Sequence, residues 1–499
     1  MIVLLGFVMI LVFMALIMTK KLSPVLALIL IPTIFGLFAG AGLGIGDMVM
    51  DAIESMSSTA ALLLFAIIYF GIMIDVGLFD KLVEVILRFC GNDPVKVVFG
   101  TALLNGAVSL DGDGSTTFIV VTAAMLPIYQ RLQMSPVVLT CVAGLINGTL
   151  NIVPWGGPTA RAASALHIDA NSIFAPMVPS LIVGLIVALF FSYLLGKSER
   201  RRLLAKGVAW VNDPSTEDSQ AESGNRGGSG KRGGSIAASV AARTEGSDDA
   251  APAGSETAGP ATQALVINQF EDEGKTTSAL TDTALDPNRA TLRPHLFWFN
   301  LVLTVAIMVL LIADILPLPY LFMIGTVLAL LVNFRGVKEQ QEELASHATS
   351  VISVVAMVMA AGVLTGVMSG TGMVDHMASW LVDIIPPALG PYMAVITGVL
   401  SIPMTFFMSN DAFYFGILPV LSETAAHYGI PATDMARASI TGQPVHLQSP
   451  LVPAILLLVS LSGVELGDHH KKVLWRALIV ALVMLAVGVL VGVIAIGHA

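Results

Sequence analysis

Two carboxylates, Asp111 and Asp113, stand in the middle of a long apolar stretch of this sequence. Between Lys96 and Arg131 they are the only charged residues, and they lie in the short polar run DGDGST (111–116). A carboxylate surrounded by apolar groups is costly unless it holds a cation. That cation is either a proton or a metal ion that takes oxygen ligands. We therefore interpret Asp111 and Asp113 as candidate metal-binding and proton-coupling residues.

Two further polar groups interrupt apolar stretches later in the sequence. Asp411 follows Ser409 and Asn410 in MSNDAF (408–413), and His446 lies in TGQPVHLQSP (441–450). Asp411 is a third candidate metal ligand for the same reason as the first two aspartates. The imidazole of a histidine titrates near neutral pH, so His446 is a third candidate for proton coupling.

The same interrupted stretches carry groups that bind anions. NIVPWGGPTARAA (151–163) contains Arg161, whose planar guanidinium can grip a carboxylate with two hydrogen bonds. Free N–H groups at helix starts attract anions, and hydroxyls and amides add donors and acceptors. The candidate substrate-binding residues are Ser115, Thr116, Thr117, Gly157, Thr159, Arg161, Ser409, Asn410 and Gln448.

Structural roles remain open for these side chains. The three aspartates could cap half-helices or hydrogen-bond their own turns. Arg161 could extend toward the membrane surface or pair with Asp169. His446 could be a packing residue whose ring nitrogens are satisfied by neighbours.

The elements that position these residues are helices in a membrane. The chain has 499 residues, of which 55% are hydrophobic and 12% are charged, and its mean hydropathy is +0.83. A soluble domain carries roughly 25% charged residues, so the composition excludes an ordinary soluble protein. Residues 207–290 differ, because they are rich in Gly, Ser, Ala and acids, and we expect them to form a disordered cytoplasmic linker.

The distribution of lysine and arginine predicts the topology of the chain. Bases collect in cytoplasmic loops, and a consistent assignment follows only if 97–130 and 391–422 do not cross the membrane. The prediction is an all-α polytopic protein of two inverted repeats, 1–206 and 291–499, with five crossing helices in each. Both termini then lie outside and the linker lies in the cytoplasm. The assignment also places a loop at 45–57, which contains acids but no base.

Two kinds of interruption recur in the two halves. Residues 97–130 and 391–422 each contain two short apolar arms around a polar tip, and we interpret them as re-entrant hairpins. Residues 135–168 and 432–462 each contain prolines and glycines at mid-length, so we expect broken crossing helices. Interrupted helices in inverted repeats are typical of secondary transporters, with the substrate near the middle of the membrane.

Four motifs of the sequence resemble a known family. VSLDGDGSTTF (108–118), NIVPWGGPTARAA (151–163), FFMSNDAFYFGILP (406–419) and GQPVHLQSPLVPA (442–454) are similar to motifs of the citrate–metal–proton symporters, within the ion-transporter superfamily. The resemblance covers both membrane halves and omits the linker. It implies proton-driven uptake of citrate as a complex with a divalent cation, and a dimer whose hairpins and broken helices move together as an elevator. It adds Asn151 and Gln443 to the substrate-binding candidates.

The expected function is therefore a secondary active transporter in the plasma membrane, or cell inner membrane. We expect it to carry a complex of citrate with Mg or Ca, coupled to protons. A sodium-coupled symporter of free di- or tricarboxylates is the alternative, and a channel is a more distant one. We expect no permanent cofactor, no nucleic-acid partner and no enzymatic activity, since we find no nucleophile–base pair in the sequence.

Overall fold

The fold is built from helices. The computed structural model describes residues 2–19, 21–112, 114–206, 289–313 and 315–496, and these residues contain no strand. The helices before residue 206 are α1 (Ile2–Met18), α2 (Pro24–Phe38), α3 (Ile45–Asp75), α4 (Leu78–Cys90), α5 (Pro94–Val108), α6 (Gly114–Arg131), α7 (Pro136–Leu150), α8 (Gly157–Leu166) and α9 (Ala170–Ala205). Those after residue 289 are α12 (Phe297–Ile312), α13 (Leu318–Asn333), α14 (Val337–Ser346), α15 (Ala348–Gly370), α16 (Met373–Ile384), α17 (Met393–Phe407), α18 (Leu418–Ala426), α19 (Ala432–Ile440), α20 (Gln443–His446), α21 (Pro453–Leu461) and α22 (Leu466–Leu490). The predicted all-helical fold is confirmed.

Several helices begin at residues that cap them. Ser23 caps α2 and Asp93 caps α5, and a proline follows each cap at the first helical position. The side chain of Asp169 accepts hydrogen bonds from the N–H groups of Asn171 and Ser172 at the start of α9. A cap satisfies N–H groups that have no partner within the helix, which matters most where lipid replaces water.

Six helical segments within the described residues are long and apolar enough to cross a membrane. They are Gly42–Asp75, Ala170–Ala205, Pro294–Ile312, Ala348–Gly370, Ala388–Phe407 and Leu466–Leu490. The segment Ala388–Phe407 falls in the predicted hairpin 391–422. Its α-helical part, α17, has 15 residues and is therefore about 23 Å long, which is shorter than the roughly 30 Å of a bilayer core.

The predicted loop at 45–57 is wrong. This segment is helical and forms the first part of α3, while α2 ends at Phe38, before the predicted end at residue 44. The topology assignment places the three acids Asp47, Asp51 and Glu54 in an external loop without bases. They are exposed and spaced at i, i+4 and i+7, so they lie on one face of a helix.

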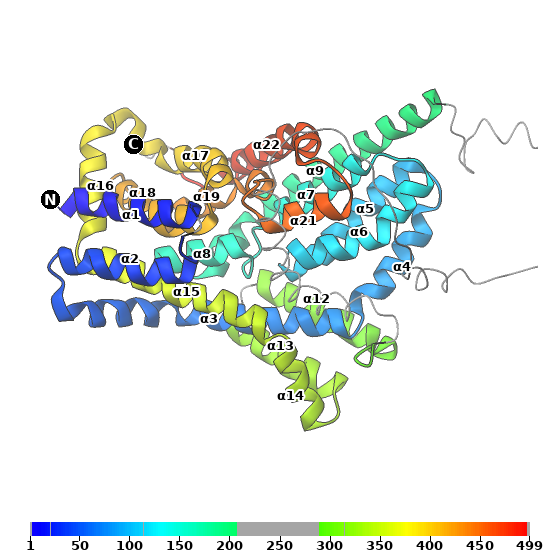
Figure 1. Ribbon diagram of the computed structural model, residues 1–499, viewed down its shortest axis with the longest axis horizontal. Helices are drawn as coiled ribbons and strands as arrows, with labels where there is room; N and C mark the ends of the chain where they lie inside the picture. The colour runs from blue at the N-terminus through cyan, green and yellow to red at the C-terminus, as the bar shows by residue number, and fades with distance from the viewer. Residues whose placement is uncertain (1, 20, 113, 207–288, 314, 497–499) are drawn as a thin grey trace, which may run out of the picture.

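The first interruption, 97–130, is a pair of helices around a tight tip. The helices α5 and α6 lie side by side (Figure 1) and are joined by the 3-10 turn Ser109–Asp111 and by Gly112. Gly112 has φ of 80°, a left-handed conformation that glycine adopts readily and other residues adopt at a cost. The indole Nε1 of Trp155 donates a hydrogen bond of 2.9 Å to the carbonyl of Leu110 and so ties the tip to the first broken helix.

The second interruption, 391–422, has an irregular tip of a different kind. After α17 the chain is extended at Met408, and the tip then enters a π-helical segment, Ala412–Ile417, that leads into α18. The hydroxyl of Ser409 accepts a hydrogen bond of 3.2 Å from the backbone N–H of Ala412. Wide π-helical turns are rare and often mark functional sites.

The helix is interrupted within both predicted segments, 135–168 and 432–462. In the first half it ends at Leu150 and resumes at Gly157. In the second half α19 ends at Ile440, the short helix α20 follows at Gln443–His446, and the helix resumes at Pro453. Prolines at the starts of α8 and α21 lack the N–H that a continuous helix would need. Each break lies close to one of the tips. Trp155 in the first break contacts the first tip, and α20, which precedes the second break, packs against α17, the helix that leads to the second tip.

Most of the predicted linker 207–290 lies outside the described residues, but its end does not. Arg289 is buried, and its guanidinium donates hydrogen bonds to the carbonyls of Ile74 and Asp75 and to the carboxylate of Asp80. The backbone N–H of Arg293 also donates to the carbonyl of Val76. The boundary at 290 is therefore corrected, because Arg289 already belongs to the folded part of the chain.

Candidate functional site

An ion pair joins the first broken helix to the second tip. Nε of Arg161, in α8, lies 2.6 Å from Oδ1 of Asp411, and the side chains are 22% and 9% exposed. A pair that is largely withheld from water interacts more strongly than one at a protein surface. A Cβ atom at Gly157 would overlap Nη1 of Arg161, so this glycine leaves room for the guanidinium. The alternative pairing of Arg161 with Asp169 is wrong, because Asp169 caps α9 and Arg161 bonds Asp411.

A chain of amides runs beside this ion pair and joins both breaks to the second tip. Nδ2 of Asn151 donates to Oε1 of Gln443 at 3.1 Å. Nε2 of Gln443 donates to the hydroxyl of Tyr414 at 2.9 Å and to Oδ1 of Asn410 at 3.4 Å. Asn410 directly precedes Asp411, so the ion pair and the amides form one polar region. The structure thus brings together five predicted site residues, which are Asn151, Arg161, Asn410, Asp411 and Gln443.

The first tip touches the same broken helix one turn earlier. Asn147 in α7 donates to the hydroxyl of Ser109 at 2.9 Å, and Asn105 donates to the same hydroxyl at 3.2 Å. Asn147 and Asn151 are four residues apart and lie on one side of α7. The amide of Asn147 therefore contacts the first tip, and the amide of Asn151 contacts Gln443 beside the second break.

The remaining residues of the first tip are placed only in part. Ser115, Thr116 and Thr117 lie in the first turn of α6, and Thr117 is buried. Asp111 ends the 3-10 turn, and Asp113 lies outside the described residues. The roles of these residues in binding and proton coupling stay predictions.

Three other predicted site residues use their polar atoms within the scaffold. The hydroxyl of Thr159 donates to the carbonyl of Ile152 at 2.8 Å, across the first break. Gln448 donates to the carbonyls of Gly144 and Pro444, and Nδ1 of His446 lies 2.6 Å from the carbonyl of Thr405. A carbonyl only accepts, so His446 carries a proton on Nδ1 and has Nε2 as its acceptor.

The arrangement suits a small polyanion that is bound to a cation. Arg161 provides a guanidinium and Asp411 provides a carboxylate. The side-chain amides next to them provide both hydrogen-bond donors and acceptors, and they belong to Asn151, Asn410 and Gln443. A carboxylate ligand would bind the guanidinium, and a hard cation would take carboxylate and amide oxygens. The side chains come from elements far apart in the sequence, so a ligand held here would bridge the two halves.

The sequence also matches known proteins. The family model described as citrate transporter matches residues 1–442. This chain belongs to the citrate transporter family. It is 44% identical over 495 residues to a "Citrate transporter" of Bacillus subtilis (strain 168), across 99% of this chain and 100% of that protein. It is 41% identical over 497 residues to the "Mg(2+)/citrate complex secondary transporter" of the same organism, with the same coverage.

A solved structure, that of the Alcanivorax borkumensis YdaH transporter, has a TM-score of 0.44 and 15% identity over 89% of this chain and 86% of that chain. Members of the citrate transporter family are transporters and not enzymes, so this chain is a membrane transporter. The predicted family is thereby confirmed.

Sequence reasoning missed several residues of the polar region in this member of the citrate transporter family. Tyr414 lies in the aromatic run AFYF (412–415), and its hydroxyl accepts a hydrogen bond from Gln443. Asn147 lies in an apolar helix, and its spacing of four residues from Asn151 could have identified it. The thioether of Met357 lies 3.2 Å from Nη2 of Arg161.

Proposed function

We propose that this member of the citrate transporter family is a secondary active transporter. Its cargo is a complex of citrate with a divalent metal ion of the Mg or Ca class, and transport of this complex is coupled to protons. The observation that carries the proposal is the Arg161–Asp411 pair, in which a fixed cation and a fixed anion lie 2.6 Å apart at the meeting of a tip and a break. The relative at 41% identity, named for a Mg(2+)/citrate complex, supports the choice of cargo.

The ion pair favours the complex over free citrate on grounds of charge. Free citrate carries about −3 near neutral pH, from the ordinary pKa values of carboxyl groups, and would meet Asp411 as a like charge. A divalent ion lowers the net charge to about −1. The complex can give a carboxylate to Arg161 and the metal to Asp411, so that neither residue is left as an unpaired charge when their ion pair opens.

The other predicted residues complete this site. Ser115, Thr116, Thr117 and Ser409 would bind citrate oxygens at the tips, and the amide chain from Asn151 to Asn410 would orient them. Asp111 and Asp113 would bind metal or protons. His446 would take up a proton on Nε2, since Nδ1 already donates to Thr405.

We further propose that the two halves are inverted repeats. GIMIDVGLFDKL (71–82) is similar to GVMSGTGMVDHM (366–377). In both places a long helix ends at a left-handed glycine, Gly77 with φ of 84° or Gly372 with φ of 70°, and an amphipathic helix follows. These helices, α4 and α16, lie at opposite ends of the long axis in Figure 1, which supports opposite orientations of the halves. An elevator motion and a homodimer follow from the family resemblance.

The expected topology completes the proposal. The basic end of α9 and the helix α14 lie toward one end of the molecule in Figure 1, and the start of α1 lies at the other. Because bases collect on the cytoplasmic side, this supports a cytoplasmic linker and external termini in the plasma membrane.

Uptake of labelled citrate by proteoliposomes tests the function. With an inward proton gradient and Mg²⁺ or Ca²⁺ outside, citrate should accumulate, and EDTA should abolish the accumulation. Equal uptake of free citrate in EDTA would refute the metal complex. Uptake driven by a sodium gradient at equal pH on both sides would instead select a sodium-coupled carrier of free carboxylates.

A further inference from the structure

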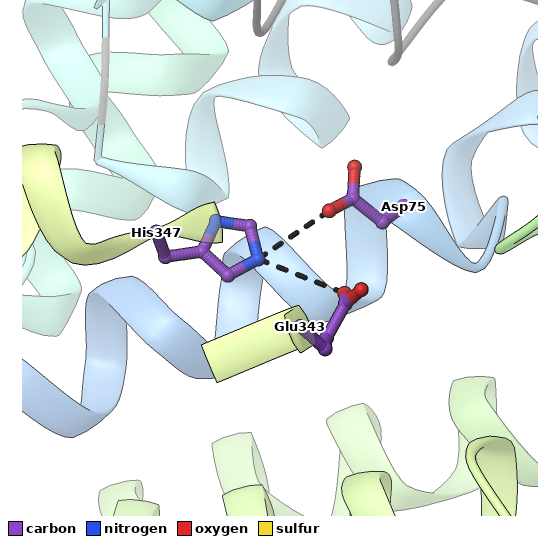
Figure 2. Close-up of side chains that lie close together, drawn as sticks. All are labelled: Asp75, Glu343 and His347. Atoms are coloured by element: carbon purple, nitrogen blue, oxygen red, sulfur yellow. Dashed lines mark ion pairs between the residues drawn. The ribbon is translucent and has the colours of Figure 1, made fainter. Parts of the chain in front are cut away.

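A second cluster of ionisable side chains lies where α3, α14 and α15 meet. Asp75 ends α3, Glu343 lies in α14, and His347 joins α14 to α15. Figure 2 shows the imidazole pointing toward both carboxylates. Nε2 of His347 lies 3.4 Å from Oδ2 of Asp75 and 3.7 Å from Oε1 of Glu343. None of these residues takes part in the proposed citrate site.

The spacing of the three side chains fits a metal ion better than direct hydrogen bonds. Protein N–H···O hydrogen bonds have heavy-atom distances of about 2.7–3.2 Å, and both distances here are longer. One ligand atom from each residue lies within 4.8 Å of the other two. Tetrahedral metal bonds of about 2.1 Å place neighbouring ligand atoms about 3.4 Å apart.

The cluster also contains polar atoms that are buried without a hydrogen-bond partner. The side chains of Glu343 and His347 are 5% and 6% exposed. Oε1 of Glu343 and Nε2 of His347 accept or donate no hydrogen bond within the structure. Such atoms are rare in native proteins, and an ion that is absent from the coordinates is one of their ordinary explanations.

The local sequence builds this arrangement. Glu343 and His347 are one helical turn apart, so they face the same side. Gly71 precedes Asp75 by one turn, and a Cβ atom there would overlap the ring of His347. Arg289 approaches the same place, but its guanidinium bonds the backbone carbonyls of Ile74 and Asp75 and the carboxylate of Asp80.

We propose that Asp75, Glu343 and His347 bind one divalent transition metal ion of the Zn²⁺ or Mn²⁺ class, separate from the transported cargo. An imidazole with two carboxylates suits these ions, whereas Mg²⁺ and Ca²⁺ prefer oxygen ligands alone. Three protein ligands leave a position for water. The ion would hold the end of α3, in the first half, to the junction of α14 and α15 in the second.

A proton on the imidazole is the alternative occupant of this cluster. Burial lowers the pKa of His347, but the nearby carboxylates of Asp75 and Glu343 outweigh it and raise the pKa to about 9. A metal ion must displace that proton, so binding is measured at slightly alkaline pH.

Metal retention by the purified full-length transporter in detergent tests the proposal. The protein is stripped with EDTA and equilibrated with Zn²⁺ in excess Mg²⁺, without citrate. Wild type should retain one Zn²⁺ per chain, and H347Q and E343Q should bind at least tenfold more weakly. The control is H427Q, because Glu423 in α18 and His427, which directly follows α18, have the same spacing and His427 is exposed. Equal retention by wild type and H347Q would overturn the proposal.

A second readout covers the case in which a variant loses stability. The melting temperature of each variant is compared with and without Zn²⁺, so each protein serves as its own reference. Zn²⁺ should raise the melting temperature of wild type and H427Q and leave that of H347Q unchanged. An equal rise in all proteins would contradict the site. Because citrate uptake is not measured, failure here leaves the proposed transport function untouched.

Discussion

Removing the charges of Arg161 and Asp411 singly and together separates their structural role from their role in binding. R161Q leaves the carboxylate of Asp411 without its cation, and D411N leaves the guanidinium without its anion. The double variant R161Q/D411N removes both charges and keeps polar side chains of similar size. We expect the single variants to be less stable than the double variant.

The structure sets the expected sizes of these effects. Breaking a fully buried ion pair costs about 3–5 kcal/mol of folding stability. Because Arg161 is 22% exposed, solvent screens part of the interaction. We therefore expect each single variant to lose about 1–3 kcal/mol of stability. The double variant should lie within about 1 kcal/mol of wild type. A hydrogen bond to a charged group contributes about 1.5–3 kcal/mol, so loss of the guanidinium should raise the citrate concentration for half-maximal uptake about 10- to 100-fold.

Thermal unfolding and citrate uptake are measured on the same protein preparations. The matched control is R437Q, because Arg437 pairs with Asp434 at 3.1 Å in α19 and both side chains are largely buried, 15% and 13% exposed. R437Q should lower the melting temperature without changing the citrate concentration for half-maximal uptake. If R161Q/D411N transports citrate with wild-type affinity, the pair is structural and the proposed binding site is wrong.

Three other variants test the surroundings of the pair. Gln443→Leu should lower the melting temperature, because Nδ2 of Asn151 loses its acceptor and the hydroxyl of Tyr414 loses a donor. The expected cost is about 1–3 kcal/mol, and an unchanged melting temperature would argue against the amide chain. Gly112→Ala should destabilise the first tip by about 1–2 kcal/mol, because Gly112 has a left-handed φ of 80°. A melting temperature equal to that of wild type would contradict this. His446→Gln should retain binding of the citrate–metal complex but lose accumulation driven by a pH gradient, and intact accumulation would exclude His446 from proton coupling.

The interrupted elements could be predicted from the sequence because their residues conflict with their surroundings. Glycines and aspartates in an apolar run, as in DGDGST (111–116), leave few alternatives to a tip. Prolines flanking polar residues at 151–158 and 443–453 likewise exclude a continuous helix. The helical start of α3 was missed because its three acids were taken as loop residues, although their spacing is that of one helix face.

Contacts between distant segments were not predictable from local patterns. Arg161 was a candidate for its chemistry, but its partner could have been any nearby acid, and we considered Asp169 and not Asp411. Tyr414 resembles its apolar neighbours until Gln443 is placed beside it. The approach of Glu343 and His347 to Asp75 requires the packing of α15 along α3, which no periodicity in either helix specifies.

The amide chain of Asn151, Gln443 and Asn410 has a consequence for energy coupling. Amides neither gain nor lose protons under physiological conditions, and a tyrosine hydroxyl keeps its proton there. These contacts are therefore insensitive to the pH difference across the membrane. Among the described residues of this polar region, acidification can act on the carboxylate of Asp411, and a search for the proton acceptor begins there and at His446.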